Sequence, residues 1–275
     1  MSAYTGSAAF TDDWQHFRFE VADGVATVTL DRPEKLNALT FEAYADLRDL
    51  LHELPQRGDA KVLVVRGAGK GFCGGGDVNE IIGQLIAMDA HDLIGFTRMT
   101  GEVIKAMREC SVPIVSGIHG IAAGAGSVIA LASDFRVVSR SARFAFLFTK
   151  VGLSGGDMGA AYLLPRIVGA GRATSLLMLG DTIDAETADR YGLVSELVDD
   201  DALDEAVRRL ARRLADGPTL GYAQTKSLIT RELDMSLGAS VELDAMTQAL
   251  LMTTADHAEF HAAFNEKRPP RWSGR

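Results

Sequence analysis

The spacing of apolar residues along the chain predicts two strands, a helix and a further strand. Residues 17–21 and 25–30 have the composition of strands on either side of an Asp-Gly turn, so a hairpin is expected to open the fold. Residues 40–54 place leucines at helical spacing, and Thr40 stands where a side chain can cap the first turn. Residues 61–67, KVLVVRG, form a continuous apolar run, which is typical of a strand buried on both faces.

The same order of elements repeats in the middle of the chain. The glycine-rich segment 71–78, GFCGGGDV, leads into a helical stretch that reaches about residue 110. A second buried strand lies within 113–120, PIVSGIHG, and is followed by the loop GIAAGAG, the short helix SVIALAS and the strand FRVVS. A strand, a glycine loop, a helix and a further strand in succession indicate an α/β architecture.

The pattern becomes helical from Asp201 onward, with few strand signals before the end of the chain. Residues 1–200 are therefore predicted to form an α/β core, within which residues 1–13 are a loose tail. Residues 201–275 are predicted to form a helical oligomerisation region, whose apolar faces must pack on the core or on another subunit.

Composition narrows the class of protein. The 275 residues are 47% hydrophobic and 24% charged, as in an ordinary globular protein. The formal net charge of −9 argues against a protein that binds nucleic acid or an anionic membrane. Cys73 and Cys110 lack metal-type spacing, so no metal site is expected. The chain begins without signal-peptide features, and no segment is apolar enough to span a bilayer, so we expect a cytoplasmic protein.

Two glycine-rich loops, at 71–78 and 119–128, share one context, since each follows a strand and precedes a helix. Neither has the spacing of a phosphate-binding loop. Both offer main-chain N–H groups at a helix start, and two such donors that converge on one oxygen would form an oxyanion hole. The alternative is that glycine only makes tight turns and allows close helix packing. Two such loops at equivalent strand-to-helix junctions favour an oxyanion-binding site over a purely structural role.

The order of several motifs resembles the crotonase superfamily, also called the enoyl-CoA hydratase/isomerase family. These motifs are FCGGGD, HGIAAGAG with SDFRVVS, KVGL, YLLPRIVG and GDTIDAETADRYGLVSELV, and LDRPEKLNAL is similar to the family's first coenzyme A segment. The resemblance implies a spiral of ββα units with a C-terminal helical trimerisation region. It also implies a homotrimer or a dimer of trimers that binds an acyl-CoA thioester. Coenzyme A would then be part of the substrate, with no permanently bound cofactor.

The resemblance also implies roles for residues of the two loops. The backbone N–H groups of Gly74 and Ala125 would bind the thioester oxygen. The residues expected along coenzyme A are Lys35, Leu36, Ala38, Gly75, Gly76 and Asp77. Asp77 also stands where it can cap the following helix.

The chain departs from the family pattern where hydratases carry two glutamates. Val128 and Phe148 occupy those positions, and neither side chain can transfer a proton. Several branches of the family carry a functional aspartate in the turn that holds Asp157 here. Apolar neighbours would raise the pKa of Asp157 into a useful range for proton transfer. Capping the following helix and contacting another subunit are the alternative roles.

These observations lead to one functional hypothesis and one alternative. We expect an acyl-CoA-processing enzyme in which Asp157 is the single acid and base, so isomerisation or thioester hydrolysis is favoured over hydration. The substrate pocket is predicted from Val128, Leu147, Phe148 and Met158, whose apolar side chains suit a hydrophobic or aromatic acyl group. The alternative is a catalytically inactive protein that binds CoA thioesters in a regulatory or structural role.

Overall fold

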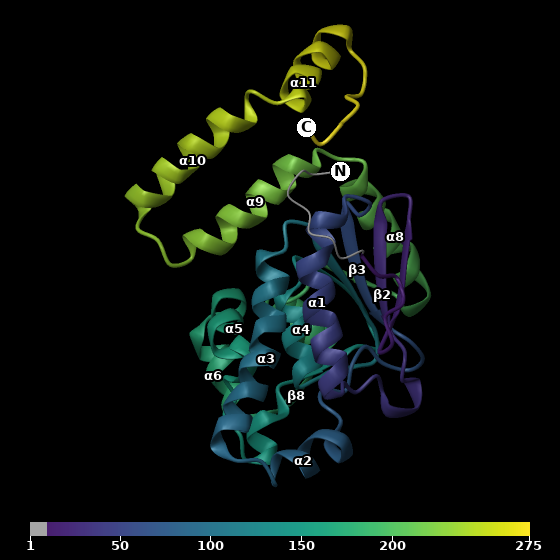
Figure 1. The fold of residues 1–275 in the computed structure, drawn as a ribbon, viewed down its shortest axis with the longest axis vertical. Coiled ribbons are helices and arrows are strands. Elements are labelled where there is room, and N and C mark those ends of the chain that lie inside the picture. Colours follow the sequence, from purple (N-terminus) through teal and green to yellow (C-terminus); the bar gives the residue numbers. More distant parts are fainter. Residues whose placement is uncertain (1–9) are drawn as a thin grey trace.

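The computed structural model describes residues 10–275, and within that range the chain forms two sheets (Figure 1). The larger sheet has the strand order β1-β2-β3-β4-β6-β9, in which β1 runs antiparallel to β2 and the remaining pairs are parallel. Its strands are β1 (Arg18–Ala22), β2 (Val25–Leu30), β3 (Val62–Gly67), β4 (Ile114–Ile118), β6 (Phe135–Ser139) and β9 (Glu196–Val198). The predicted opening hairpin is present: Asp23 and Gly24 connect its strands, both with positive φ, as the tight turn of a twisted hairpin requires.

The smaller sheet contains short strands in the order β5-β7-β8. These are β5 (Ile121–Ala123), β7 (Arg143–Ala145) and β8 (Thr182–Asp184). β5 directly follows β4, and β7 directly follows β6, so the chain passes from the large sheet to the small one before it enters the next helix. This repetition is the predicted ββα spiral. The sequence predicts a loop at the residues of β5, because three residues among glycines carry too little periodicity to indicate a strand.

Helices pack on both faces of the large sheet (Figure 1). One face meets the main core, to which α1 (Phe41–Arg57), α3 (Ala90–Glu109), α4 (Ala125–Ala132), α5 (Ala160–Val168) and α6 (Ala170–Leu179) contribute. The chain also forms the short helices α2 (Gly83–Leu85) and α7 (Ala185–Arg190). α1 extends three residues beyond its predicted end, and Thr40 caps it by accepting a hydrogen bond from the Ala43 amide at 3.2 Å.

The opposite face of the sheet is covered by α8 (Leu203–Ala215). Val207 and Ala211 of this helix pack in a second apolar cluster with Val64 and Val115 of the sheet. α8 falls within the region predicted to serve oligomerisation, yet it completes the core. The predicted domain boundary at residue 200 stays a prediction.

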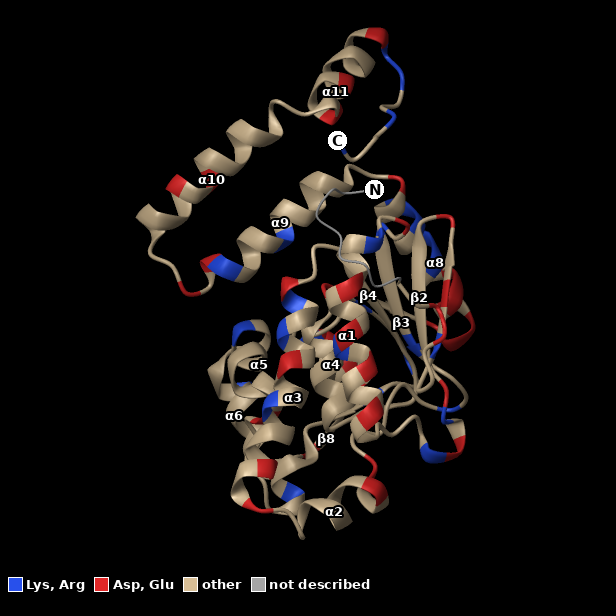
Figure 2. Ribbon diagram, in the orientation of Figure 1, with Lys and Arg blue, Asp and Glu red and all other residues tan. Residues whose placement is uncertain are grey.

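The chain ends in α9 (Thr219–Glu232), α10 (Leu237–Leu251) and α11 (Ala255–Glu266), and α10 and α11 stand away from the body of the molecule (Figure 1). α9 is anchored by the buried Lys226, whose Nζ lies 2.8 Å from Asp134 Oδ2. Few charged residues lie on α10 (Figure 2). Among the described helices, none is long and apolar enough to cross a membrane.

Candidate active site

The loop after β3 runs beside residues 36–39, and this pairing leaves the Gly76 amide without an acceptor in the described chain. Leu39 donates its N–H to the carbonyl of Gly75 and accepts a hydrogen bond from the Asp77 amide, both at 2.8 Å. The carbonyl of Gly75 and the N–H of Asp77 therefore face Leu39. Because successive residues of an extended chain face opposite sides, the Gly76 N–H points away from Leu39. Within residues 10–275 this amide has no hydrogen-bond acceptor.

The donor predicted on this loop needs a correction. The Gly74 N–H donates to the carbonyl of Leu36 at 2.7 Å, so it is already engaged within the fold. Gly76, two residues further on, carries the available N–H. The sequence could not separate the three consecutive glycines, because only the pairing of the loop with residues 36–39 decides which amide stays free.

The loop is held from beneath by the side chain of Asn37, which is 1% exposed. Its Nδ2 donates to the carbonyls of Ala68 and Gly71 at 2.8 Å, and its Oδ1 accepts from the Arg32 amide at 3.0 Å. A buried amide with its donors and acceptor satisfied is a rigid support. The glycine loop therefore has a fixed shape without a ligand.

The two glycine-rich loops touch each other. Gly75 has φ +101°, and a Cβ atom built on it would lie 3.0 Å from the carbonyl oxygen of Ala123 and 3.6 Å from the nitrogen of Ala125. A side chain at this position would separate the loops. Glycine is required here by both the backbone conformation and the close approach.

Ala125 is the residue predicted to carry the second amide. It is the first residue of α4, so its N–H has no partner inside the helix and lies at the positive end of the helix dipole. No acceptor for this amide is found among the described residues. Gly76 and Ala125 thus present unpaired N–H groups from adjoining loops, and both residues line one cavity.

This cavity, called the glycine-loop cavity below, has a volume of about 180 Å³ and a mainly apolar wall. Tyr44, Thr100 and Asp157 are the polar side chains of its lining within the described chain. Its lining is completed by Gly74, Gly75, Gly76, Val78, Ile81, Ile82, Leu85, Phe96, Gly124, Ala125, Leu147, Phe148, Val151, Leu153 and Met158.

Asp157 brings a carboxylate to the cavity. It begins a short turn, Asp157–Gly159, and its Oδ1 accepts a hydrogen bond from the Met158 amide at 2.8 Å. Burial raises its pKa above the ordinary value, because a charge is poorly solvated there, and the bond from the Met158 amide offsets part of that effect. Met158 has φ 52°, a costly conformation for a side chain other than glycine.

The structure decides against the capping role considered for Asp157. The N-cap of the turn is Gly156 and that of α5 is Gly159, so Asp157 occupies neither capping position. Its carboxylate bonds its immediate neighbour and faces the cavity lined by the two unpaired amides.

The predicted pocket residues separate into two groups. Leu147, Phe148 and Met158 line the glycine-loop cavity. Val128 does not, because it is fully buried in the main core, one turn further along α4 than Ala125. Tyr44 also lines this cavity, although it sits among the core residues of α1 and carries no motif by which the sequence predicts it.

The residues predicted along coenzyme A lie on the same side as the glycine loop. Lys35 and Leu36 are exposed, Ala38 is half-buried, and Gly75 and Gly76 line the cavity.

Asp77 differs from the others in this set, because its carboxylate serves the fold. It caps the short helix Val78–Ile82 by accepting from the amides of Asn79 and Glu80, and its Oδ2 lies 3.1 Å from Arg32 Nη2. These bonds, that from the Glu80 amide foremost, lower its pKa. The structure therefore confirms the predicted cap, and the place of Asp77 along coenzyme A stays a prediction.

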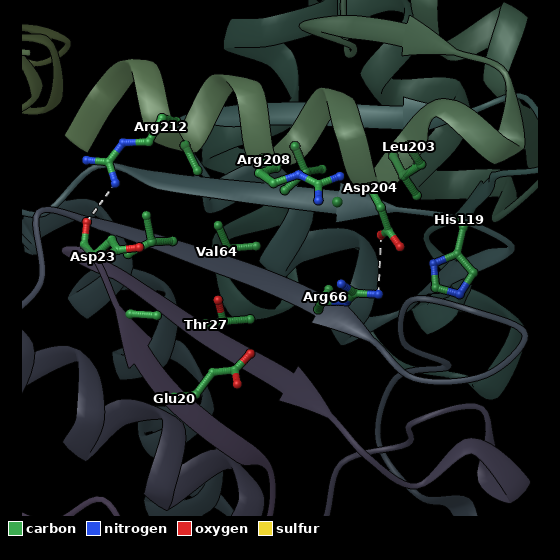
Figure 3. A pocket seen from close by; sticks show the side chains of 15 residues that line it. Glu20, Asp23, Thr27, Val64, Arg66, His119, Leu203, Asp204, Arg208 and Arg212 are labelled. Atoms are coloured by element: carbon green, nitrogen blue, oxygen red, sulfur yellow. Dashed lines mark hydrogen bonds and ion pairs between the residues drawn. The ribbon is translucent and has the colours of Figure 1, made fainter. Parts of the chain in front are cut away.

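A second cavity, of about 490 Å³, lies on the opposite face of the large sheet, beneath α8 (Figure 3). An ion pair and a hydrogen bond cross it: Arg66 Nη2 lies 3.3 Å from Asp204 Oδ1, and Arg212 donates to the backbone carbonyl of Asp23 at 2.9 Å. These arginines hold α8 to the sheet. The described residues contain no cluster of three metal-ligating side chains. Unpaired amides beside a half-buried carboxylate therefore mark the smaller cavity as the candidate site.

Comparison with known proteins identifies the family of this chain. Residues 20–275 match the family model described as enoyl-CoA hydratase/isomerase. The chain is 35% identical to 1,2-epoxyphenylacetyl-CoA isomerase of Escherichia coli K12, over 93% of this chain and 97% of the relative. It is 37% identical to a probable enoyl-CoA hydratase of Rhodobacter capsulatus, over 94% and 98% of the two chains.

A solved structure is also closely similar. The crystal structure of a putative enoyl-CoA hydratase from Streptomyces coelicolor A3(2) superposes with a TM-score of 0.98 at 67% identity, and the match covers 100% of both chains. The chain belongs to the enoyl-CoA hydratase/isomerase family, the crotonase superfamily.

Proposed function

We propose that this protein isomerises an acyl-CoA thioester through an enolate, with Asp157 as the single acid and base. One observation carries the proposal: the unpaired amides of Gly76 and Ala125 and the half-buried carboxylate of Asp157 line the same cavity. An oxygen that accepts hydrogen bonds from both N–H groups is stabilised most when it carries a negative charge. These amides therefore favour the enolate over the bound thioester.

The proton steps follow from this arrangement. Asp157 removes a proton from a carbon of the acyl group, and the electron pair of the broken C–H bond moves into the thioester as an enolate. The protonated Asp157 then returns its proton to a different carbon, and the carbonyl re-forms. The double bond has moved, no water is consumed, and one group has served as base and then as acid.

Hydration has less support in this cavity. Addition of water uses one carboxylate as base and another as acid, whereas Asp157 is the one carboxylate of the lining within residues 10–275. Val128 and Phe148 occupy the positions at which the resemblance implies glutamates. An E. coli relative is named an isomerase, which supports the same reading.

The cavity wall favours a hydrophobic acyl group. Phe96, Phe148 and Leu147 contribute apolar surface. A flat ring or a short branched chain would bury that surface at about 25 cal/mol per Å². Coenzyme A would enter as part of the substrate, beside the exposed Lys35 and Leu36.

We also propose that the C-terminal helices assemble copies of the chain into a trimer or a dimer of trimers. Leu237, Leu250 and Phe264 are 80%, 71% and 72% exposed. Large apolar side chains that are exposed on helices projecting from the core are typical of a subunit interface. α9 is fixed to the core by Lys226, so it can carry the outer helices toward a neighbouring copy.

The test is Asp157→Asn, with the exposed Asp181→Asn as its matched control. Turnover of a panel of enoyl-, dienoyl- and aryl-CoA thioesters should fall by about 10²- to 10⁴-fold in Asp157→Asn and stay at the wild-type level in the control. Thioester binding by calorimetry should persist in both. Unchanged turnover in Asp157→Asn contradicts the proposal. Tight binding without turnover by the wild-type protein would favour the inactive binding protein, and release of free coenzyme A would indicate thioester hydrolysis.

A further inference from the structure

The glycine-loop cavity contains a hydroxyl group that the proposed proton steps do not use. Tyr44 is 3% exposed, and its side chain forms part of the cavity wall. Its hydroxyl oxygen lies 3.5 Å from the position that a Cβ on Gly76 would occupy, so it sits beside the candidate oxyanion donor.

The other polar side chains of the cavity have partners. Thr100 donates its hydroxyl to the Thr97 carbonyl at 3.1 Å, within α3. Asp157 accepts from the Met158 amide through Oδ1. The Tyr44 hydroxyl has no hydrogen-bond partner among residues 10–275, which makes it an unpaired donor in a mostly apolar wall.

The ring of Tyr44 is held by aromatic packing. It meets the ring of Phe96 edge to face, with centroids 6.2 Å apart, and Phe96 meets Phe41 in the same way at 4.9 Å. Such contacts limit the freedom of the ring. The hydroxyl is therefore presented to the cavity in a set direction.

The environment also keeps the phenol protonated. Burial raises the pKa of Tyr44, and the neighbouring Cys73 and Asp157 raise it further. The group is thus a hydrogen-bond donor under ordinary conditions and not a proton-transfer group. The hydroxyl opens onto the cavity, so an acyl group that fills the cavity either accepts a hydrogen bond from it or leaves it buried and unpaired, at a cost of about 1–3 kcal/mol.

We propose that Tyr44 determines specificity by donating a hydrogen bond to an oxygen carried by the acyl chain, so that the site takes oxygen-bearing acyl-CoA thioesters in preference to plain hydrocarbon ones. This rests on the proposed function, because it assumes that an acyl-CoA occupies the cavity. A hydrocarbon chain would fill the apolar wall but leave the hydroxyl unpaired, and sites built around a buried polar group discriminate strongly on that basis.

The experiment compares two thioesters of the same chain length, 3-oxobutyryl-CoA and butyryl-CoA, with free coenzyme A as the reference. Their affinities are measured by calorimetry for the wild-type protein and for Tyr44→Phe, which removes the hydroxyl and keeps the ring. We expect Tyr44→Phe to weaken 3-oxobutyryl-CoA binding by about 5- to 150-fold and not to weaken butyryl-CoA binding, because the hydrocarbon chain no longer leaves a hydroxyl unpaired.

Tyr162→Phe is the matched control. Its hydroxyl donates to Asp234 at 2.7 Å outside the glycine-loop cavity, so neither affinity should change. Equal weakening of both thioesters by Tyr44→Phe, or weakening of neither, overturns the specificity role while the proposed function stands. If neither thioester binds the wild-type protein more tightly than free coenzyme A, the proposed function fails and the role of Tyr44 fails with it.

Discussion

Gly75 is the point at which the two glycine loops meet, and replacing it tests whether their contact builds the site. In Gly75→Ala the added methyl would stand 3.0 Å from the Ala123 carbonyl oxygen and 3.6 Å from the Ala125 nitrogen, at φ +101°. The positive φ costs about 1–2 kcal/mol for an L-residue. Relieving the contact costs about 1–3 kcal/mol more, so we expect a loss of about 2–5 kcal/mol of unfolding free energy.

The activity should fall further than the stability alone explains. The methyl would push the loop of Gly76 away from Ala125, and loss of one oxyanion donor lowers kcat by about 10²- to 10³-fold. Gly58→Ala is the control: Gly58 has φ +76°, open space around a Cβ, and a place at the far end of α1. It should lose about 1–2 kcal/mol of unfolding free energy and keep its kcat.

Urea denaturation and steady-state kinetics on folded protein measure the two effects separately. If Gly75→Ala is destabilised yet turns over as fast as Gly58→Ala, the contact between the loops does not position the catalytic amides.

Two further predictions concern charge and assembly. Asp157 has a raised pKa in the folded state, so the folded protein binds this proton more tightly than the unfolded chain does. The resulting contribution to the free energy of unfolding is fully present below the ordinary pKa of 3.8 and is lost as the pH rises through the folded pKa. Asp157→Asn, which can still accept from the Met158 amide, should therefore raise Tm at pH 7, with a gain that shrinks toward pH 3.8; a constant gain would contradict this. The double variant Leu237→Asp with Leu250→Asp should yield smaller particles in light scattering than the wild-type protein, whereas a monomeric wild type would refute the assembly.

Much of the fold could be predicted because it rests on local patterns. The leucine spacing of α1 and the apolar run of β3 each specify an element without tertiary information. β5 escaped prediction because three residues become a strand only when they pair with β7, a contact made across about twenty residues.

The candidate site was predicted in its parts more than in its geometry. The resemblance to the family implies the roles of Ala125 and Asp157, and each position matches a motif of this sequence. The choice between Gly74 and Gly76 depends on which amide donates its hydrogen bond to the carbonyl of Leu36. The burial of Val128 depends on how α4 packs in the main core. Tyr44 carries no sequence signal, because its missing partner is visible only in the folded chain.

The most direct test of the account is a crystal structure of Asp157→Asn with an enoyl-CoA bound. We expect the thioester oxygen to lie within about 3.2 Å of both the Gly76 and the Ala125 nitrogens. A thioester oxygen bound elsewhere, with either amide left facing water, would contradict it.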